Sequence, residues 1–204
     1  MSEEKRKTGI DIIGDVPWGT HFCQFYKTKK DLINILVPYF KAGLENNEFC
    51  MWITSKPLSE KDAAKALKEV LPDLDSYLKK EQIEIIPYDR WYLKNGGFNS
   101  KSVLRGWVKK LDSALSKGYD GLRLTGNTFW LETKNWRTFA DYEEEVCRVI
   151  GKHRILALCS YSLNKCKASE VIDVVGKHQF ALIKHDRKWE LIKSFQQKEA
   201  EEEI

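Results

Sequence analysis

Long apolar segments are absent from this sequence of 204 residues. No run approaches the roughly 20 consecutive apolar residues that a membrane-spanning helix requires, and Met1–Lys7 leads into no hydrophobic stretch of signal-peptide type. Hydrophobic residues nevertheless make up 42% of the chain and charged residues 31%, which is the composition of a globular protein. We therefore expect a cytoplasmic protein that folds without a membrane partner.

Neither the charges nor the cysteines form a functional pattern. The 34 Lys and Arg residues are interspersed with 30 Asp and Glu residues, so the net charge of +4 gives no basic stripe for nucleic acid. The five cysteines are irregularly spaced and include no CxxC pair, which excludes a zinc ribbon and a thioredoxin-like centre. We expect reduced thiols and no direct contact with nucleic acid.

A glycine-rich loop for phosphate is also missing. Lys27 and Thr28 follow the first β-like run, but no glycines precede them to supply the backbone N–H groups that wrap phosphates. No other complete set of catalytic residues can be assembled from the chain. The sequence therefore predicts a protein that is not an enzyme and that carries no cofactor.

Short β-like runs alternate with longer helical patterns, as in βαβ units around a parallel sheet. Buried strands are predicted over residues 21–26, 49–55, 83–89, 121–126 and 155–161. Helices are predicted over residues 29–43, 59–71, 100–117, 135–151 and 168–175. Residues 180–184 and 189–192 flank a turn and predict an antiparallel hairpin at one edge of the sheet.

These elements predict an α/β fold, a three-layer sandwich with a mainly parallel sheet and a C-terminal antiparallel edge hairpin. A single domain is expected to span residues 14–195. Residues 1–13 would form an N-terminal extension, and residues 196–204 a polar tail, either a frayed helix or a linker cut from a longer chain.

Local signals set the ends and faces of the predicted helices. Thr28 and Ser59 are the expected N-caps, the latter in a capping box with Asp62. Pro38 predicts a kink or an early end of its helix. The acidic run Glu143–Glu145 is expected on a solvated helix face.

In an open parallel sheet the ligand binds beyond the carboxyl ends of the strands. Aromatic and charged side chains near those ends are the candidate ligand-binding residues: Tyr26, Asp89, Trp91, Arg123, Trp130 and Tyr161. They suit an apolar pocket with a few polar groups, which fits a small uncharged or cationic compound. Arg123 lies on a buried strand and needs a partner, for which Asp89 and Glu132 are the expected candidates.

His21 and Cys23 are two residues apart on a predicted strand, so their side chains point to the same face. They are candidate residues for binding a polar ligand or a metal, but two ligands do not complete a metal site. Further ligands are expected from Cys159, Tyr161 or the segment at Asp89. The alternative is a buried, hydrogen-bonded start of the strand. Surface or core positions are expected for the other histidines, His153, His178 and His185.

Three segments resemble domains of the RecA/KaiC-like ATPase family. They are Gly14–Thr20 before the first strand, Gly43–Glu48 before the second, and Tyr119–Leu124 at the place of a Walker B strand. Besides the missing glycine loop, Thr125-Gly126 replaces the acidic end of the Walker B strand. The resemblance therefore implies the fold of this family but not its ATP hydrolysis.

The MEDS domain, a methanogen/methylotroph sensory domain, is the family that the chain resembles more specifically. The resemblance covers roughly residues 14–193 and rests on Gly14-Asp15-x-x-Trp18-Gly19, His21-x-Cys23-x-x-Tyr26, Tyr119-x-Gly121-x-Arg123-x-x-Gly126 and Leu158-Cys159-x-Tyr161. It implies a degenerate RecA/KaiC-like domain that senses small hydrocarbon derivatives in prokaryotic signal transduction. It also implies a signalling partner such as a histidine kinase or a transcription regulator.

The hypothesis is thus a non-catalytic sensory domain that recognises a small hydrocarbon derivative, such as a one-carbon or methylated compound. Closing of the segment over residues 90–100 above the pocket is the expected signal. Two alternatives stay open. One is a nucleotide-binding relative of RecA-like ATPases, and the other is a module for protein interaction or homo-oligomerisation.

Overall fold

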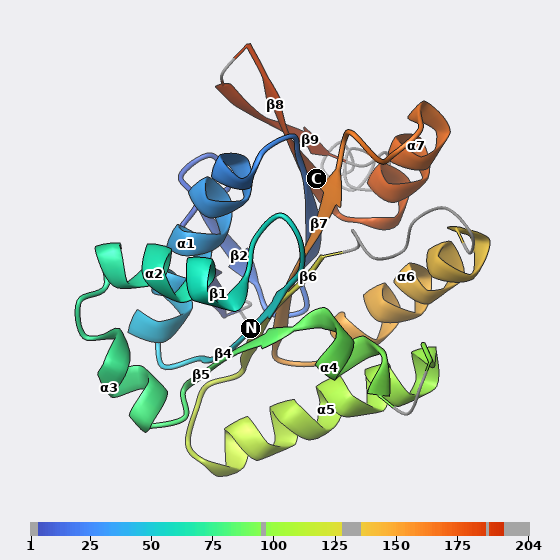
Figure 1. The fold of residues 1–204 in the computed structure, drawn as a ribbon. Helices are drawn as coiled ribbons and strands as arrows, with labels where there is room; N and C mark the ends of the chain where they lie inside the picture. The colour runs from blue at the N-terminus through green and yellow to red at the C-terminus, as the bar shows by residue number, and fades with distance from the viewer. Residues whose placement is uncertain (1–3, 95–96, 128–135, 187, 194–204) are drawn as a thin grey trace.

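A seven-stranded sheet organises the computed structural model, which describes residues 4–94, 97–127, 136–186 and 188–193. Its strands follow the order β5-β4-β6-β7-β3-β8-β9 (Figure 1). They are β3 (His21–Tyr26), β4 (Phe49–Thr54), β5 (Ile83–Pro87), β6 (Leu122–Asn127), β7 (Ile155–Ser162), β8 (Phe180–His185) and β9 (Lys188–Lys193). Neighbouring strands are parallel except β8 and β9, which form the predicted antiparallel edge hairpin. A separate antiparallel pair, β1 (Lys5–Lys7) and β2 (Asp15–Pro17), precedes the sheet.

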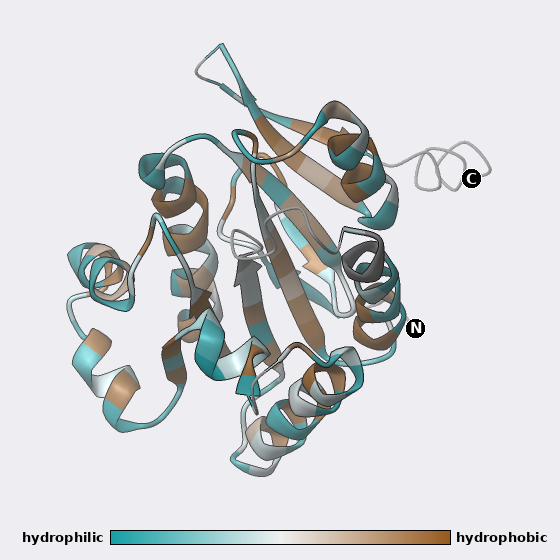
Figure 2. Ribbon diagram, turned by 45° about the vertical axis from the view of Figure 1, so that its right-hand side comes forward, coloured by the Kyte–Doolittle hydropathy of each residue, from teal (hydrophilic) through white to brown (hydrophobic). Residues whose placement is uncertain are grey.

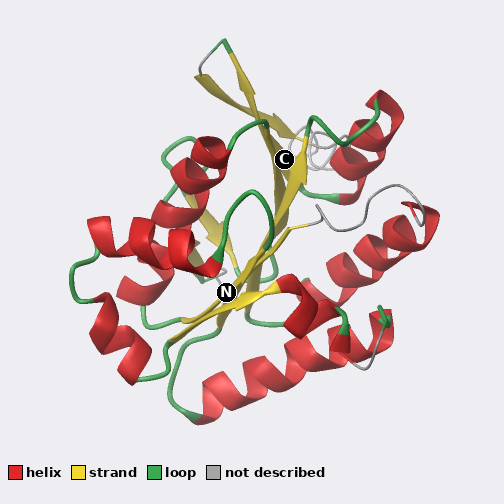
Figure 3. Ribbon diagram, in the orientation of Figure 1, coloured by secondary structure: helices red, strands yellow, loops and turns green. Residues whose placement is uncertain are grey.

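Helices cover both faces of the sheet. They are α1 (Lys29–Glu45), α2 (Glu60–Val70), α3 (Leu74–Lys79), α4 (Tyr88–Tyr92), α5 (Ser100–Ser116), α6 (Trp136–Ile150) and α7 (Ala168–Lys177). The first three lie on one face and α4 to α7 on the other (Figures 1 and 3). This confirms the predicted three-layer α/β sandwich with a mainly parallel sheet. None of the described helices combines the length and apolarity that crossing a membrane requires.

The central strands are buried on both faces, as their continuous apolar runs indicate. Every residue of β3, β4 and β7 is buried. Side chains alternate along a strand, so Phe22 and Tyr26 pack on the side of α1, whereas Cys23 and Phe25 face α4 to α7. Figure 2 shows this apolar band of strands between helices whose outer faces are hydrophilic.

Some helix ends differ from the sequence prediction. Helix α1 continues past Pro38 to Glu45, so the predicted early end is wrong. Gly43 lies inside α1, where an added Cβ would be 2.6 Å from Arg123 Cδ. The glycine therefore allows the close approach of a side chain from β6 and does not stop the helix. Residues 88–92 form α4, where the end of a strand and a loop are predicted.

A buried ion pair joins the central strand β6 to the start of the chain. Arg123 donates from Nε to Glu48 Oε2 at 2.5 Å and from Nη2 to Glu48 Oε1 at 3.1 Å, and both side chains are fully buried. The guanidinium also donates to the backbone oxygens of Lys7, Thr8 and Tyr39. One side chain thus holds the first residues of the chain, α1 and the segment before β4 together.

Replacing Arg123 by Met should destabilise the fold by about 3–5 kcal/mol, because Glu48 would remain as an unpaired buried charge. The double variant Arg123→Met/Glu48→Met should lose less than the sum of the two single variants. Urea denaturation of the four proteins measures both effects. The exposed pair Lys117–Glu81 is the control, since its removal should change stability far less. Equal losses at the buried and the exposed pair would contradict the account.

The N-terminus of α1 is closed by side chains of its own first turn. Thr28 caps α1 and Ser59 caps α2, as the sequence predicts. Asp31 Oδ2 accepts hydrogen bonds from the backbone N–H groups of Lys27 at 3.2 Å and Thr28 at 2.9 Å. Lys184 Nζ, from β8, donates to Asp31 Oδ1 at 2.9 Å. Burial alone would raise the pKa of Asp31, but the hydrogen bonds from Lys184 and Thr28 outweigh it and lower that pKa.

The variant Asp31→Asn should be less stable than the wild type by about 1 kcal/mol at neutral pH, since it weakens a cap and removes the charge that pairs with Lys184. Because the folded-state pKa of Asp31 is lowered, its stabilisation is present above the unfolded-state pKa of about 4 and is lost as the pH falls through the folded-state pKa. The stability difference between the two proteins should therefore shrink in acid. Urea denaturation over a pH series measures it, and a difference that grows toward low pH would contradict the assignment.

Candidate functional site

Four buried side chains that can bind metals or exchange protons converge on one face of the sheet. They are His21, Glu143, Cys159 and His178, hereafter the His/Cys/Glu cluster. His21 starts β3, and Cys159 lies in the neighbouring parallel strand β7, directly opposite Cys23. Residues two apart share a face, so His21, Cys23 and Cys159 point the same way. Glu143 comes from α6 and His178 directly follows α7, the helices that cover this face.

The polar atoms of the cluster lie close together. His21 Nε2 is 3.3 Å from Cys159 Sγ and 3.5 Å from Glu143 Oε2. His178 Nε2 is also 3.5 Å from Glu143 Oε2, and Cys159 Sγ is 3.7 Å from the same oxygen. One carboxylate oxygen therefore has three neighbours. The side chains of Glu143 and both histidines are 4% exposed or less, so these contacts are shielded from solvent.

Backbone contact sets the proton position on His178. Its Nδ1 lies 2.7 Å from the carbonyl oxygen of Val174, and because a carbonyl only accepts, Nδ1 carries the proton. In the neutral ring, Nε2 then presents a lone pair to the Glu143 carboxylate. Among the described residues, the buried Nδ1 of His21 has no hydrogen-bond partner at all. The cluster thus holds hydrogen-bonding capacity that its own residues leave unused.

Burial and mutual contacts shift the pKa values in the cluster. Burial, reinforced by His178, lowers the pKa of His21 well below its ordinary value. Burial also opposes a charge on His178, but Cys23, Cys159 and Glu143 outweigh it and raise the pKa of His178. Burial and the Glu143 carboxylate raise the pKa of Cys159 to about 12. These directions favour the uncharged forms of His21 and of the Cys159 thiol and the charged form of His178.

This arrangement has two chemical interpretations. In one, a buried His178 imidazolium forms an ion pair with the Glu143 carboxylate at 3.5 Å. In the other, two imidazole nitrogens, a sulfur and a carboxylate surround a metal ion, since these are ligand types that zinc takes in proteins. Nucleophilic catalysis is disfavoured, because a catalytic cysteine needs a lowered pKa and that of Cys159 is raised.

The structure brings some of the sequence-predicted residues together at the cluster. His21 belongs to it, and Cys23 lies on the same face of β3. Tyr161, two residues after Cys159, points to this face as well, and its ring meets the His178 ring edge-on at a centroid distance of 5.7 Å.

Two other predicted residues lie on the opposite face of the sheet. Tyr26 packs in the core on the side of α1. Arg123 bonds to Glu48, so its expected pairing with Asp89 is wrong, and Glu132 lies outside the described residues. Because side chains alternate between the two faces of a strand, Tyr26 and Arg123 point away from the face that carries the cluster.

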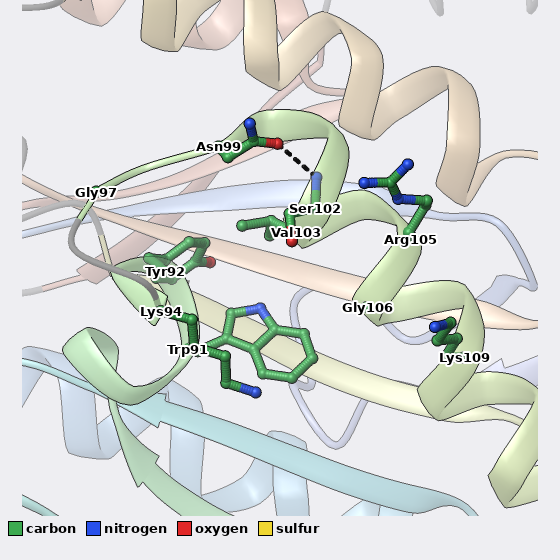
Figure 4. A pocket seen from close by; sticks show the side chains of 10 residues that line it. All are labelled: Trp91, Tyr92, Lys94, Gly97, Asn99, Ser102, Val103, Arg105, Gly106 and Lys109. Carbon is green, nitrogen blue, oxygen red and sulfur yellow. Dashed lines mark hydrogen bonds between the residues drawn. The ribbon is translucent and has the colours of Figure 1, made fainter.

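Trp91 and Asp89 lie in α4. Trp91 lines a cavity of about 500 Å³ between α4 and α5 (Figure 4). Basic and aromatic side chains line it too, among them Tyr92, Lys94, Arg105 and Lys109. Tyr92 lies near the cluster as well. Burial raises the pKa of Tyr92, and the nearby Tyr142, Cys159 and Glu143 raise it further. Trp130 lies outside the described residues, as do residues 95 and 96 of the segment that is expected to close.

Sequence reasoning missed two members of the cluster. A solvated face is predicted for the acidic run in α6, but Glu143 is only 3% exposed, while Glu144 is exposed. The helical spacing indicated the buried position of Glu143, because this residue lies three residues before Val146 and seven before Ile150, which are both buried in α6. His178 carried no such signal, since only the docking of α7 brings it to β3 and β7.

The class of fold is shown by the similarity of this structure to a solved one. The structure is similar to the crystal structure of a KaiC-like protein from the hyperthermophilic archaeon Pyrococcus horikoshii OT3, with a TM-score of 0.61 over 93% of this chain and 85% of that chain. The two sequences are 15% identical, so the similarity shows a KaiC-like, RecA-type fold and nothing further. No curated protein matches the sequence.

The family follows from the sequence profile that matches residues 20–179, described as MEDS, the MEthanogen/methylotroph, DcmR Sensory domain. The match covers most of the chain, which therefore belongs to the MEDS family. This confirms the resemblance seen in the short motifs. All four residues of the His/Cys/Glu cluster lie within the matched range.

Replacing Glu143 by Gln should destabilise the fold by about 3–5 kcal/mol, because the change removes the carboxylate that faces two buried histidines. Glu144→Gln, one residue along on the exposed side of α6, is the matched control and should have little effect. Urea denaturation at neutral pH compares the two. Equally small losses would mean that Glu143 does not carry a buried charge.

Proposed function

We propose that this chain is a non-catalytic sensory domain of a prokaryotic signalling protein, and that it binds a small hydrocarbon derivative such as a one-carbon or methylated compound. Membership of a family of sensory domains supports the signalling role. The observation that carries the binding role is the unused hydrogen-bonding capacity of the His/Cys/Glu cluster. Buried polar atoms without partners are costly, and a bound ligand that uses them removes that cost.

The cavity between α4 and α5 gives a small compound room, and Tyr92 joins its wall to the surroundings of the cluster. Its volume of about 500 Å³ is within the range of small-molecule sites. Trp91 and Tyr92 supply apolar surface to its wall, which suits methyl groups (Figure 4). Tyr92 is the residue shared between this wall and the surroundings of Cys159 and Glu143. We therefore infer that a compound with a methyl group and one polar atom binds where this wall approaches the cluster.

The origin of the cluster residues suggests how binding becomes a signal. His21 and Cys159 belong to the sheet, whereas Glu143 and His178 arrive with α6 and α7. A ligand held among them would favour one packing of these helices on the sheet over another. A partner such as a histidine kinase or a transcription regulator would read the outer faces of the two helices.

The nucleotide-binding alternative is disfavoured by the turn between β3 and α1. A phosphate at this turn would need the backbone N–H groups of Lys27 and Thr28. Both groups already donate to the carboxylate of Asp31, which in turn pairs with Lys184. A phosphate would have to displace the Asp31 carboxylate from these N–H groups and would be repelled by its negative charge. This observation supports a domain without ATP hydrolysis.

A thermal-shift screen tests the proposed function. The purified, reduced protein is heated with methanol, methylated amines, methylated sulfides, small halocarbons or Mg-ATP, since a compound that binds the folded state raises its apparent stability. We expect a concentration-dependent rise with a one-carbon or methylated compound. Cys159→Ala should abolish this rise, whereas Cys147→Ala, at a half-buried position of α6, should retain it.

Three results would contradict the proposal in different ways. A rise with Mg-ATP alone would favour the nucleotide-binding alternative. A rise that Trp91→Leu removes and Cys159→Ala leaves intact would place binding in the cavity without the cluster. No rise with any compound would favour a module for protein interaction or homo-oligomerisation.

A further inference from the structure

We propose that the His/Cys/Glu cluster is a binding site for a divalent transition metal, and that its ligand chemistry selects zinc. The metal site is a separate proposal from small-molecule sensing, because the evidence for it is the arrangement of the four side chains alone. The ligand atoms would be His21 Nε2, Glu143 Oε2, Cys159 Sγ and His178 Nε2, which all lie within 4.8 Å of one another.

Four of the six distances between these atoms match the edges of a coordination tetrahedron, and the other two are at most 4.8 Å. Zinc binds nitrogen and oxygen at about 2.0–2.2 Å and sulfur at about 2.3 Å, so neighbouring ligand atoms in a tetrahedral site are about 3.3–3.6 Å apart. The separations from His21 Nε2 are 3.3 Å to Cys159 Sγ and 3.5 Å to Glu143 Oε2. From Glu143 Oε2 they are 3.5 Å to His178 Nε2 and 3.7 Å to Cys159 Sγ. A single ion could therefore bind all four atoms after a shift of the His178 side chain toward His21 and Cys159.

Charge favours a divalent cation at this place. A thiolate at Cys159 and the carboxylate of Glu143 carry two negative charges, and both histidines bind a metal in their neutral form. The four ligands and one divalent ion are thus neutral together, which suits a site whose members are all buried. Binding of the ion would replace the contact between His178 Nε2 and the Glu143 carboxylate by a bond from each group to the metal.

The ligand types narrow the choice of metal. Magnesium and calcium prefer a full set of oxygen ligands, which the cluster does not offer. Two imidazoles with one thiolate and one carboxylate suit a borderline ion that accepts tetrahedral geometry, and zinc is that ion among the common cellular metals. Four protein ligands complete the tetrahedron, so the site would tie α6 and α7 to the sheet, and His21 Nδ1, which is not one of the four ligand atoms, would stay available to a small compound.

A backbone carbonyl oxygen already orients the ring of His178. Metal-binding histidines donate their other ring N–H to a carbonyl or carboxylate, which fixes the ring and leaves a lone pair for the metal. His178 Nδ1 makes this contact with the carbonyl oxygen of Val174 at 2.7 Å. The ring is therefore already oriented with Nε2 toward the other ligands.

Metal content and cobalt substitution test the inference. The full chain is purified without a histidine tag, its zinc is measured by mass spectrometry, and the metal-free reduced protein is titrated with Co²⁺. We expect one zinc per chain and a cobalt spectrum that saturates at one equivalent, with tetrahedral bands and a thiolate-to-cobalt charge-transfer band.

The matched variants are Cys159→Ala in the cluster and Cys50→Ala, a buried cysteine on the opposite face of the sheet. Zinc content should fall at least about tenfold in Cys159→Ala and stay unchanged in Cys50→Ala. If Cys159→Ala fails to fold, the cobalt spectrum of the wild type decides. Metal at background level with no charge-transfer band in the wild type would overturn the inference. So would a band that persists unchanged in a folded Cys159→Ala protein.

The metal site and the proposed sensing role fail separately in these experiments. Bound zinc without any thermal shift by a small compound would support the metal site and contradict the sensing role. A thermal shift by a small compound in a protein that binds neither zinc nor cobalt would do the reverse.

Discussion

The guanidinium of Arg123 makes contacts with three separate parts of the chain from the centre of the sheet. It pairs with Glu48 and donates to the backbone of Lys7, Thr8 and Tyr39, all in the layer on the side of α1. A charge at this depth is tolerated only because each of its N–H groups has a partner. The backbone of α1 has to approach closely, and Gly43 makes that possible. The position of α1, and with it one whole layer, depends on this pairing.

The opposite face of the sheet is built differently. There the polar residues His21, Glu143, Cys159 and His178 meet one another, and their hydrogen-bonding groups are only partly used. Buried side chains that can bind a metal or exchange protons, gathered in one place, are where a functional site is expected. The convergence of these four side chains is the main argument for locating the function at the His/Cys/Glu cluster.

Much of the architecture could be predicted from sequence because its signals are local. Continuous apolar runs predicted β3, β4 and β7, and hydroxyl side chains predicted the caps of α1 and α2. The need of Arg123 for a partner was also predictable. Its identity was not, since Glu48 lies 75 residues away and no local pattern connects the two.

The candidate site was predictable only in part, for the same physical reason. Strand periodicity placed His21 and Cys23 on one face, and Cys159 was expected as a further ligand. Glu143 was hidden in an acidic run in which the next residue, Glu144, is exposed, and His178 reaches the cluster only when α7 docks on the sheet. Side chains brought together by the packing of separate elements leave no spacing in the sequence.

A crystal structure with diffraction data collected at the zinc absorption edge tests the central claim most directly. The account predicts an anomalous peak bonded to His21 Nε2, Glu143 Oε2, Cys159 Sγ and His178 Nε2, with His178 Nδ1 still donating to Val174. A map without a peak at this place, in which His178 and Glu143 approach each other as a direct ion pair in crystals grown with zinc, would contradict it.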